Sequence, residues 1–290
     1  MELFEYQDEN CRGRIERFDY IGTEDAKKYA LVYLPNGYDA EPQRRYDILY
    51  LMHGGGGSPD AWLDSCPFKN MLDRSIASGR AKPLIVVFPT FYKTISTRKD
   101  GQIDHDFEHA SVLSFQEELT SQLIPALEGR YRTFAEGTDP ESLKKARTHR
   151  GFGGFSMGAV NTWYACYLHI DYFSVFLPLS GDLWLYGEKG GGKKPRETAL
   201  ALKDAAVKNG LGPKDFAIYA ATGTKDIACP NLTPQIEAMK QLGDFYQFSE
   251  DFAKGNLHYL LAEGYYHEYP AVYQYVYNYL PYLFGGSNEE

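Results

Sequence analysis

The segment from Gly154 to Gly158 carries Ser156 at its centre and has the Gly-x-Ser-x-Gly form of a nucleophile elbow. In such an elbow, a sharp turn from a strand into a helix strains the serine backbone and exposes the hydroxyl. Glycines flank the serine because side chains at these positions would clash with the neighbouring strand and helix. Residues 149–155 favour a strand and residues 159–165 favour a helix. Ser156 is therefore the predicted nucleophile.

A nucleophilic serine needs a base, and in this kind of site the histidine follows the serine along the chain. His169 falls on the helix that is expected after the serine, where its side chain should point away from Ser156. His258 falls at the amino end of the last predicted strand, which is the wrong edge of the sheet. His267 lies just past the carboxyl end of that strand and is the predicted base.

The acid is expected between the serine and the histidine. Asp226 follows the predicted strand at residues 216–221 and is the predicted acid, whereas Asp182, at the end of a different strand, is the alternative. In this mechanism neutral His267 takes the Ser156 proton while the hydroxyl oxygen attacks an ester carbonyl. The aspartate fixes the imidazole tautomer and stabilises the imidazolium. We therefore expect activity to fall in acid, as the histidine protonates.

The same chemistry needs two N–H groups that hold the oxyanion. One is the amide after the nucleophile, at Met157, and the other comes from a loop after an earlier strand. The apolar stretch at residues 48–52 runs into a glycine loop at residues 54–57. Gly55 is the predicted second donor because it follows the His-Gly pair, and His53 is expected to brace the loop.

Short apolar stretches alternate with helical ones, which predicts an α/β fold with a mainly parallel central sheet and helices on both faces. We expect one domain over residues 1–290, with residues 285–290 as a tail or linker stub. Strands are expected at residues 30–34, 48–52, 84–88, 149–155, 173–179, 216–221 and 257–262, and helices at residues 114–129 and 269–284.

The segment at residues 92–109 follows the strand at residues 84–88, so it should emerge at the carboxyl edge of the sheet, where α/β folds bind ligands. Its first part is rich in β-formers, and Asp100-Gly101 is a hairpin-turn signal after which residues 102–107 could return. A β-hairpin over the active site and a solvated loop without a role are both consistent with this pattern.

The chain has 290 residues, a net charge of −9 and 43% apolar residues, enough for a sizeable core. The acidic balance disfavours nucleic acids and anionic membranes as partners, because both attract clustered Lys and Arg. The apolar runs, such as residues 84–88, are far shorter than the ~20 residues that span a bilayer. The first residues show neither the basic nor the apolar region of a signal peptide.

The four cysteines form no Cys-x-x-Cys pair, so a zinc site or redox motif is not expected, and no metal or cofactor is predicted. The sequence leaves open whether Cys11, Cys66, Cys166 and Cys229 are bridged or free. Aromatic residues make up 15% of the chain, with 24 Tyr. Such rings suit a sugar- or aromatic-binding surface, although core packing explains most of them.

The chain resembles the family 1 carbohydrate esterases, most closely the feruloyl esterase modules attached to bacterial and anaerobic-fungal xylanases. The resemblance runs from about residue 32 to residue 284 and rests on short matches that are specific only together. They are Tyr33-Leu-Pro-x-Gly-Tyr38, Leu51-Met-His-Gly-Gly-Gly56, Gly151-Phe-Gly-Gly-Phe-Ser-Met-Gly158, Pro178-Leu-Ser-Gly-Asp-x-Trp184, Ala221-Thr-Gly-x-x-Asp-Ile-Ala228, Pro234-Gln-Ile-Glu-Ala-Met239 and Leu280-Pro-Tyr-x-Phe284.

The resemblance implies an α/β-hydrolase fold and hydrolysis of hydroxycinnamoyl (feruloyl) esters of plant cell-wall arabinoxylan through an acyl-serine. It maps the family's triad onto the serine, aspartate and histidine predicted above, and its oxyanion donors onto Gly55 and Met157. It places Trp184 beside the feruloyl ring. Asp182 and Trp62 are further candidates for substrate contact, although core packing is the better explanation for Trp62.

The resemblance also implies secretion, feruloylated xylan or arabinoxylan oligosaccharides as binding partners, and a xylanase or cellulosome appendage outside this chain. Acetylxylan esterase, S-formylglutathione hydrolase-like esterase and mycolyltransferase-like acyl transfer are alternatives within the same chemistry. A non-catalytic carbohydrate-binding module is the alternative of another class. Hydrolysis of methyl ferulate, aryl acetate and S-formylglutathione separates the esterases, and xylan binding without turnover would indicate the binding module.

Overall fold

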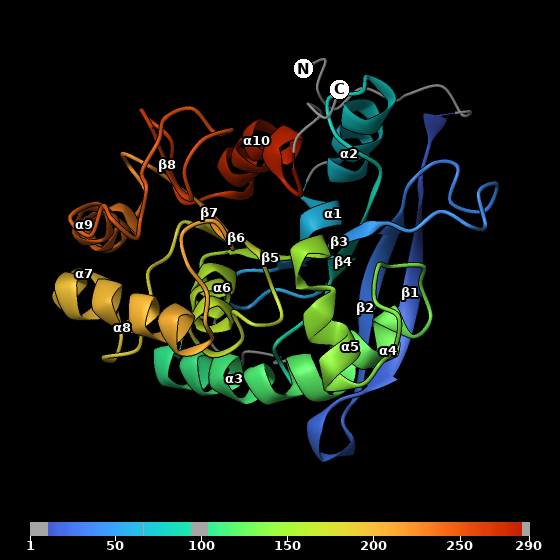
Figure 1. The fold of residues 1–290 in the computed structure, drawn as a ribbon, viewed down its shortest axis with the longest axis horizontal. Helices are drawn as coiled ribbons and strands as arrows, with labels where there is room; N and C mark the ends of the chain where they lie inside the picture. The colour runs from blue at the N-terminus through green and yellow to red at the C-terminus, as the bar shows by residue number, and fades with distance from the viewer. Residues whose placement is uncertain (1–10, 66, 94–103, 286–290) are drawn as a thin grey trace.

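A computed structural model of the chain describes residues 11–65, 67–93 and 104–285, with an eight-stranded sheet at its centre (Figure 1). The strands are β1 (Arg14–Ile21), β2 (Lys27–Leu34), β3 (Asp47–Met52), β4 (Leu84–Phe88), β5 (Arg150–Phe155), β6 (Val175–Leu179), β7 (Ala217–Gly223) and β8 (Leu257–Ala262). Their order across the sheet is β1-β2-β4-β3-β5-β6-β7-β8. Strands β3 to β8 are parallel, and β1 and β2 form an antiparallel edge.

Helices cover both faces of this sheet. The described helices are α1 (Ala61–Asp64), α2 (Phe68–Ala77), α3 (His105–Glu118), α4 (Ile124–Glu128), α5 (Pro140–Lys145), α6 (Met157–Leu168), α7 (Gly190–Lys193), α8 (Pro195–Lys208), α9 (Cys229–Lys240) and α10 (Tyr269–Tyr279). Helices α3, α6 and α8 pack on one face, and α1, α2 and α10 pack on the other (Figure 1). The predicted α/β fold, with a mainly parallel sheet covered on both faces, is confirmed.

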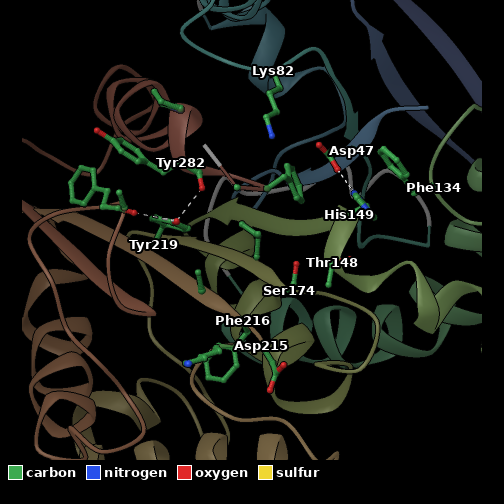
Figure 2. Close-up of a pocket in the computed structure, with 18 of the residues that line it drawn as sticks. Asp47, Lys82, Phe134, Thr148, His149, Ser174, Asp215, Phe216, Tyr219 and Tyr282 are labelled. Carbon is green, nitrogen blue, oxygen red and sulfur yellow. Dashed lines mark hydrogen bonds and ion pairs between the residues drawn. The ribbon is translucent and has the colours of Figure 1, made fainter. Parts of the chain in front are cut away.

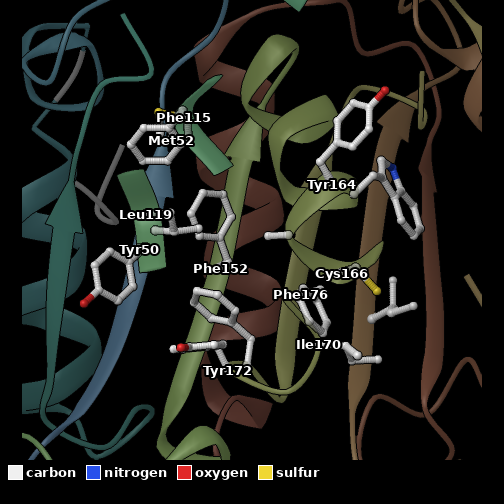
Figure 3. Close-up of a cluster of buried hydrophobic side chains, with 14 of the residues drawn as sticks. Tyr50, Met52, Phe115, Leu119, Phe152, Tyr164, Cys166, Ile170, Tyr172 and Phe176 are labelled. Carbon is white, nitrogen blue, oxygen red and sulfur yellow. The ribbon is translucent and has the colours of Figure 1, made fainter. Parts of the chain in front are cut away.

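The central strands are apolar without interruption because each of their faces packs against a core. In β3, Tyr50 and Met52 belong to the core beneath α3 and α6, whereas Leu49 and Leu51 belong to the core beneath α2 and α10. Figure 3 shows part of the first core, where the rings of Tyr50 and Phe152 stack across two neighbouring strands at a centroid distance of 6.5 Å. Two apolar cores therefore hold the sheet that positions the site.

The predicted strands coincide with β2 to β8 apart from their ends. The predicted helix at residues 269–284 is α10 followed by a 3-10 turn, Leu280–Tyr282. The helix predicted at residues 114–129 begins earlier, with α3, and reaches α4 through a π-helical turn, Leu119–Leu123. None of the helices in the described residues is both long and apolar enough to span a bilayer.

The segment predicted as a hairpin, residues 92–109, differs from that prediction where it is described. Helix α3 starts at His105, and the Asp104 side chain caps it by accepting a hydrogen bond from the Phe107 N–H at 3.1 Å. The prediction of a strand that returns as far as Phe107 is therefore wrong, because Asp104 is the helix cap and residues 105–107 belong to α3. Residues 94–103, which would hold the rest of the hairpin, lie outside the described residues.

A buried ion pair ties the start of β5 to the end of α4. The Arg150 guanidinium donates to both carboxylate oxygens of Glu128, at 2.5 and 2.8 Å, and both side chains are 1% exposed. Arg150 also donates to the carbonyls of Leu143 and Tyr172, and Glu128 accepts from the Thr133 hydroxyl. The strand that carries Ser156 is thus anchored at its amino end by a fully bonded pair.

Glu128→Gln is expected to lower the free energy of unfolding by roughly 3–5 kcal/mol, because it leaves a buried guanidinium without its counter-charge. Urea unfolding followed by circular dichroism measures this loss. Glu141→Gln is the matched control, since it breaks the exposed pair between Lys145 and Glu141 and should leave stability unchanged within error. Equal losses in the two variants would contradict the anchoring role.

Candidate active site

Ser156 directly follows β5 and begins α6 with a strained backbone. Its φ of 57° and ψ of −116° lie in a region that L-residues rarely adopt. The elbow can close only over glycine. A Cβ added at Gly158 would lie 2.6 Å from the carbonyl oxygen of Met52, and one at Gly154 would lie 2.6 Å from the carbonyl carbon of Gly158. The Gly-x-Ser-x-Gly pattern is therefore placed in the tight strand-to-helix turn that the sequence predicts.

The structure brings the predicted nucleophile, base and acid into one hydrogen-bonded series. The Nε2 atom of His267 lies 2.9 Å from the Ser156 hydroxyl, and its Nδ1 lies 2.7 Å from a carboxylate oxygen of Asp226. The three groups come from loops at the carboxyl ends of β5, β7 and β8. Since a carboxylate only accepts, Nδ1 carries the proton, which leaves the Nε2 lone pair facing the serine.

Asp226 is held in its charged form although its side chain is fully buried. Burial raises the pKa of this carboxyl group. The His267 imidazole, the Ser180 hydroxyl and the Ala228 N–H together lower it by more, so the pKa lies below its usual value. The Ala228 N–H donates to the same oxygen at 2.8 Å. A carboxylate at this point stabilises a neighbouring imidazolium, which is what a serine–histidine pair requires.

Two amides beside Ser156 have no acceptor among the described residues: those of Gly55 and Met157. A Cβ added at Gly55 would lie 3.2 Å from the Met157 side chain, so the two residues are neighbours across the elbow. Backbone N–H groups that are free of other acceptors and lie next to a nucleophile are suitable components of an oxyanion hole. Both donors predicted from the sequence are thus placed together.

His53 holds the glycine loop from beneath, in the bracing position that the sequence predicts. Its Nδ1 lies 2.7 Å from the Gly54 carbonyl oxygen, and its Nε2 lies 2.8 Å from the Thr90 hydroxyl. Burial lowers the pKa of His53 to about 4, so the ring is neutral at physiological pH. With Nδ1 as the donor to Gly54, the Nε2 atom accepts from Thr90.

A pocket of about 460 Å³ opens beside the serine. Its lining is mostly apolar, and it contains Trp184 and Asp182 from the loop after β6. The sequence did not identify several other lining side chains, among them those of His105, Ile227 and Asn231. Ile227, 74% exposed, immediately follows Asp226, and such an exposed apolar residue beside a predicted acid could have signalled a substrate-facing position.

Trp62 differs from its prediction as a candidate for substrate contact, and Asp182 does not take the role of the alternative acid. Trp62 is fully buried, with its indole N–H donating to the Met52 carbonyl, so it cannot touch a ligand and belongs to the core. Asp182, the alternative acid, does not reach His267. It accepts hydrogen bonds from the Trp184 indole at 3.3 Å and from the Gly191 N–H at 2.9 Å. Asp182 therefore fixes the loop that carries the Trp184 wall.

A larger cavity, of about 1160 Å³, lies at the opposite edge of the sheet (Figure 2). Its walls include Asp47, His149, Ser174 and Phe216, which stand at or just before the amino ends of parallel strands. Ser156 stands at the carboxyl edge, where ligands of α/β sheets bind. The smaller pocket is therefore the candidate site.

The described residues contain no cluster of His, Cys, Asp or Glu that could hold a metal ion. Cys11, Cys166 and Cys229 are free thiols, and Cys66 lies outside the described residues. Burial raises the pKa of the Cys166 thiol, so this group is a small hydrophobe of the core rather than a nucleophile.

Intrinsic fluorescence should titrate with a midpoint near pH 6. Burial raises the pKa of Asp182 to about 6, and its carboxylate accepts from the Trp184 indole, so protonation changes the environment of that indole. Trp184→Phe and Asp182→Asn should each abolish the transition. A transition that survives in both variants would show that another group is responsible.

The family model described as "Putative esterase" matches residues 25–287 of this chain. Endo-1,4-beta-xylanase Y of Acetivibrio thermocellus is 40% identical over 273 residues, which cover 94% of this chain and 23% of that protein. Endo-1,4-beta-xylanase/feruloyl esterase of Xylanibacter ruminicola is 26% identical over 224 residues, which cover 76% of this chain and 29% of that protein. The chain thus spans about a quarter of the length of these two relatives.

A solved structure is also similar over nearly the whole chain. It is a serine-to-alanine mutant of the feruloyl esterase module from Clostridium thermocellum complexed with sinapinate. It superposes with a TM-score of 0.83 and 38% identity, covering 99% of this chain and 94% of that one. The described fold is therefore of the α/β-hydrolase type. The chain belongs to the esterase family whose model matches residues 25–287, a family of carboxylic ester hydrolases.

Proposed function

We propose that this chain is a feruloyl esterase, which cleaves hydroxycinnamoyl esters of xylan through an acyl-serine intermediate. The observation that carries the proposal is the bonded series of Ser156, His267 and Asp226 at the mouth of a pocket walled by Trp184. The similarity to a feruloyl esterase module complexed with sinapinate, itself a hydroxycinnamate, supports the choice of acyl group.

Acylation begins when the Ser156 oxygen attacks the ester carbonyl carbon and its proton passes to Nε2 of His267. The carbonyl oxygen becomes an oxyanion that accepts hydrogen bonds from the amides of Gly55 and Met157. The tetrahedral intermediate collapses by breaking the bond to the sugar oxygen, which takes the proton from His267 and leaves as an alcohol. Water then attacks the acyl-serine by the same route and releases the hydroxycinnamate.

Asp226 supplies the charge that makes this proton transfer favourable. The carboxylate lies 2.7 Å from Nδ1 of His267, and the Asp226 side chain is fully buried. An ion pair is stronger in such surroundings than in water. The imidazolium is therefore stabilised in the step in which the serine oxygen bonds to carbon.

The pocket favours a large, planar acyl group over an acetyl or formyl group. Its volume of about 460 Å³ lies in the range of sites that enclose small organic ligands. Trp184 lines this pocket with a side chain that is 6% exposed, and its ring offers an apolar contact to a phenolic ring, whereas an acetyl group would leave most of the pocket unused. Acetylxylan esterase and S-formylglutathione hydrolase activities are therefore second to the feruloyl esterase activity.

We further propose that the chain acts outside the cell, as one module beside a xylanase. Two relatives are xylanases of which this chain matches about a quarter. A xylanase that shortens the backbone and an esterase that removes hydroxycinnamoyl groups would act on one polymer. The proposed binding partners are feruloylated xylan or arabinoxylan oligosaccharides.

Ser156→Ala removes the attacking oxygen, and we expect kcat on methyl ferulate to fall by at least about 10⁴-fold. Asp226→Asn keeps the size of the acid but favours the wrong imidazole tautomer, and a loss of about 10⁴-fold is expected as in serine proteases. Chromatographic detection of ferulate measures both rates. Labelling by a fluorophosphonate should be lost in Ser156→Ala and strongly slowed in Asp226→Asn, because the probe reacts with the same activated oxygen. Full activity in Ser156→Ala would refute the proposed nucleophile.

Trp184→Ala should lower kcat/KM on methyl ferulate by about 10-fold or more, because a ring stacked on the indole loses both its stacking partner and buried apolar area. The same variant provides its own control on 4-nitrophenyl acetate, whose acetyl group does not reach the wall. An equal loss on the two esters would show that Trp184 supports the pocket instead of contacting the acyl group.

A further inference from the structure

The four amides of the glycine loop at residues 54–57 have different hydrogen-bond partners. The Gly54 N–H faces the Tyr269 hydroxyl at 3.4 Å, and the Gly57 N–H donates to the Gly54 carbonyl oxygen at 3.1 Å. The Gly56 N–H donates to the Tyr92 hydroxyl at 2.6 Å. Within the described residues, only the Gly55 amide of this loop is left without an acceptor. The amides on either side of Gly55, the proposed donor, thus already donate to hydroxyl or carbonyl oxygens.

The Tyr92 hydroxyl is itself held in place by a buried acid. It donates to a carboxylate oxygen of Glu108 at 2.5 Å, and Glu108 is 1% exposed. The Tyr92 ring stacks on Phe107 at a centroid distance of 6.0 Å and on His53 at 5.5 Å. Because both the ring and the hydroxyl are fixed, the Gly56 amide has an acceptor at one defined position.

These contacts join the oxyanion loop to two elements that carry none of the proposed triad. Tyr92 follows the end of β4, and Glu108 lies in the first turn of α3. A Cβ added at Gly55 would lie 3.5 Å from the Glu108 carboxyl carbon, so the acid packs directly against the loop. Glu108 therefore reaches the loop both by contact with Gly55 and through the Tyr92 hydroxyl.

Peptide geometry converts this contact into control of the Gly55 N–H. The plane that contains this N–H also contains the Gly54 carbonyl, which accepts from His53 at 2.7 Å. The next plane contains the Gly56 N–H, which Tyr92 holds. Because glycine has little intrinsic preference in φ and ψ, the orientation of the Gly55 amide depends on the contacts of both planes, one with His53 and the other with Tyr92.

We propose that Tyr92, held by Glu108, is a positioning residue that aims the Gly55 N–H at the oxyanion. This inference rests on the proposed function, in which Gly55 is an oxyanion donor. The oxyanion exists only during the reaction, so misalignment should affect kcat and leave substrate binding intact.

Tyr92→Phe removes the hydroxyl with little change in shape. We expect kcat on methyl ferulate to fall roughly 10–100-fold, which is less than the ~10²–10³-fold loss of a whole donor, with KM unchanged within about twofold. Affinity for a phenylboronic acid, whose serine adduct places an oxygen in the hole, should fall by a similar factor. Tyr279→Phe is the matched control because it removes a buried hydroxyl that donates to the Ala220 carbonyl, and its kcat should stay within about twofold of wild type.

Glu108→Gln gives a second, independent variant, because its amide oxygen can still accept from the Tyr92 hydroxyl. Its loss in kcat should be smaller than that of Tyr92→Phe, and the double variant should resemble Tyr92→Phe alone if Glu108 acts through Tyr92. Melting temperatures of all variants are measured in parallel. Losses in kcat that follow the melting temperature, or that add in the double variant, would overturn the positioning role.

The positioning role of Tyr92 and the proposed function can be tested separately. If Tyr92→Phe keeps wild-type kcat while Ser156→Ala is inactive, the positioning role is wrong and the proposed function stands. If Ser156→Ala keeps its activity, the proposed function is wrong, and with it the oxyanion role of Gly55. A rise in KM at constant kcat in Tyr92→Phe would also overturn the inference, since it indicates a substrate contact.

Discussion

The hydrogen bond between His267 and Ser156 joins residues 111 positions apart, and most of the fold serves to hold its two atoms 2.9 Å apart. On the serine side, the strained backbone is fixed because the Ser156 N–H donates to the Leu179 carbonyl and the flanking glycines let β5, α6 and β3 approach closely. On the histidine side, the ring packs against Phe155 at a centroid distance of 4.6 Å and bonds to Asp226. Both side chains are therefore positioned by contacts on either side of the bond that joins them.

The parallel sheet explains why these groups collect at one edge. Strands β3, β5, β7 and β8 all end there, and the loop after each of them supplies a different group: an amide, a hydroxyl, a carboxylate and an imidazole. In the proposed mechanism the buried carboxylate needs its bonded partners, because an isolated buried charge is unfavourable by several kcal/mol. The same burial of the carboxylate strengthens its action on the imidazolium. Burial of the carboxylate therefore lowers stability unless its hydrogen bonds are made, and it also strengthens stabilisation of the imidazolium.

The sequence predicts the sheet and the triad because their signals are local. An apolar strand followed by a glycine-flanked serine or by a lone histidine marks a strand end, and parallel strands bring such ends together. The edge strand β1 was not predicted, because charged residues alternate with its apolar ones and no continuous apolar run marks it. The alternation of buried Phe18 and Tyr20 with exposed neighbours is the pattern that could have revealed it. The contacts of Tyr92 and Glu108 with the glycine loop were beyond reach, since they depend on how α3 packs and on no pattern in either segment.

The proposed mechanism requires a covalent acyl group on one named oxygen, and its direct detection tests the account most sharply. Turnover of methyl ferulate is quenched with acid in the first catalytic cycles, and the digested protein is analysed by mass spectrometry. The account predicts a feruloyl group on the peptide that contains Ser156, which accumulates at the rate of the first product burst and disappears when substrate is exhausted. A feruloyl group on another residue, or rapid turnover without any acylated peptide when deacylation limits the rate, would contradict it.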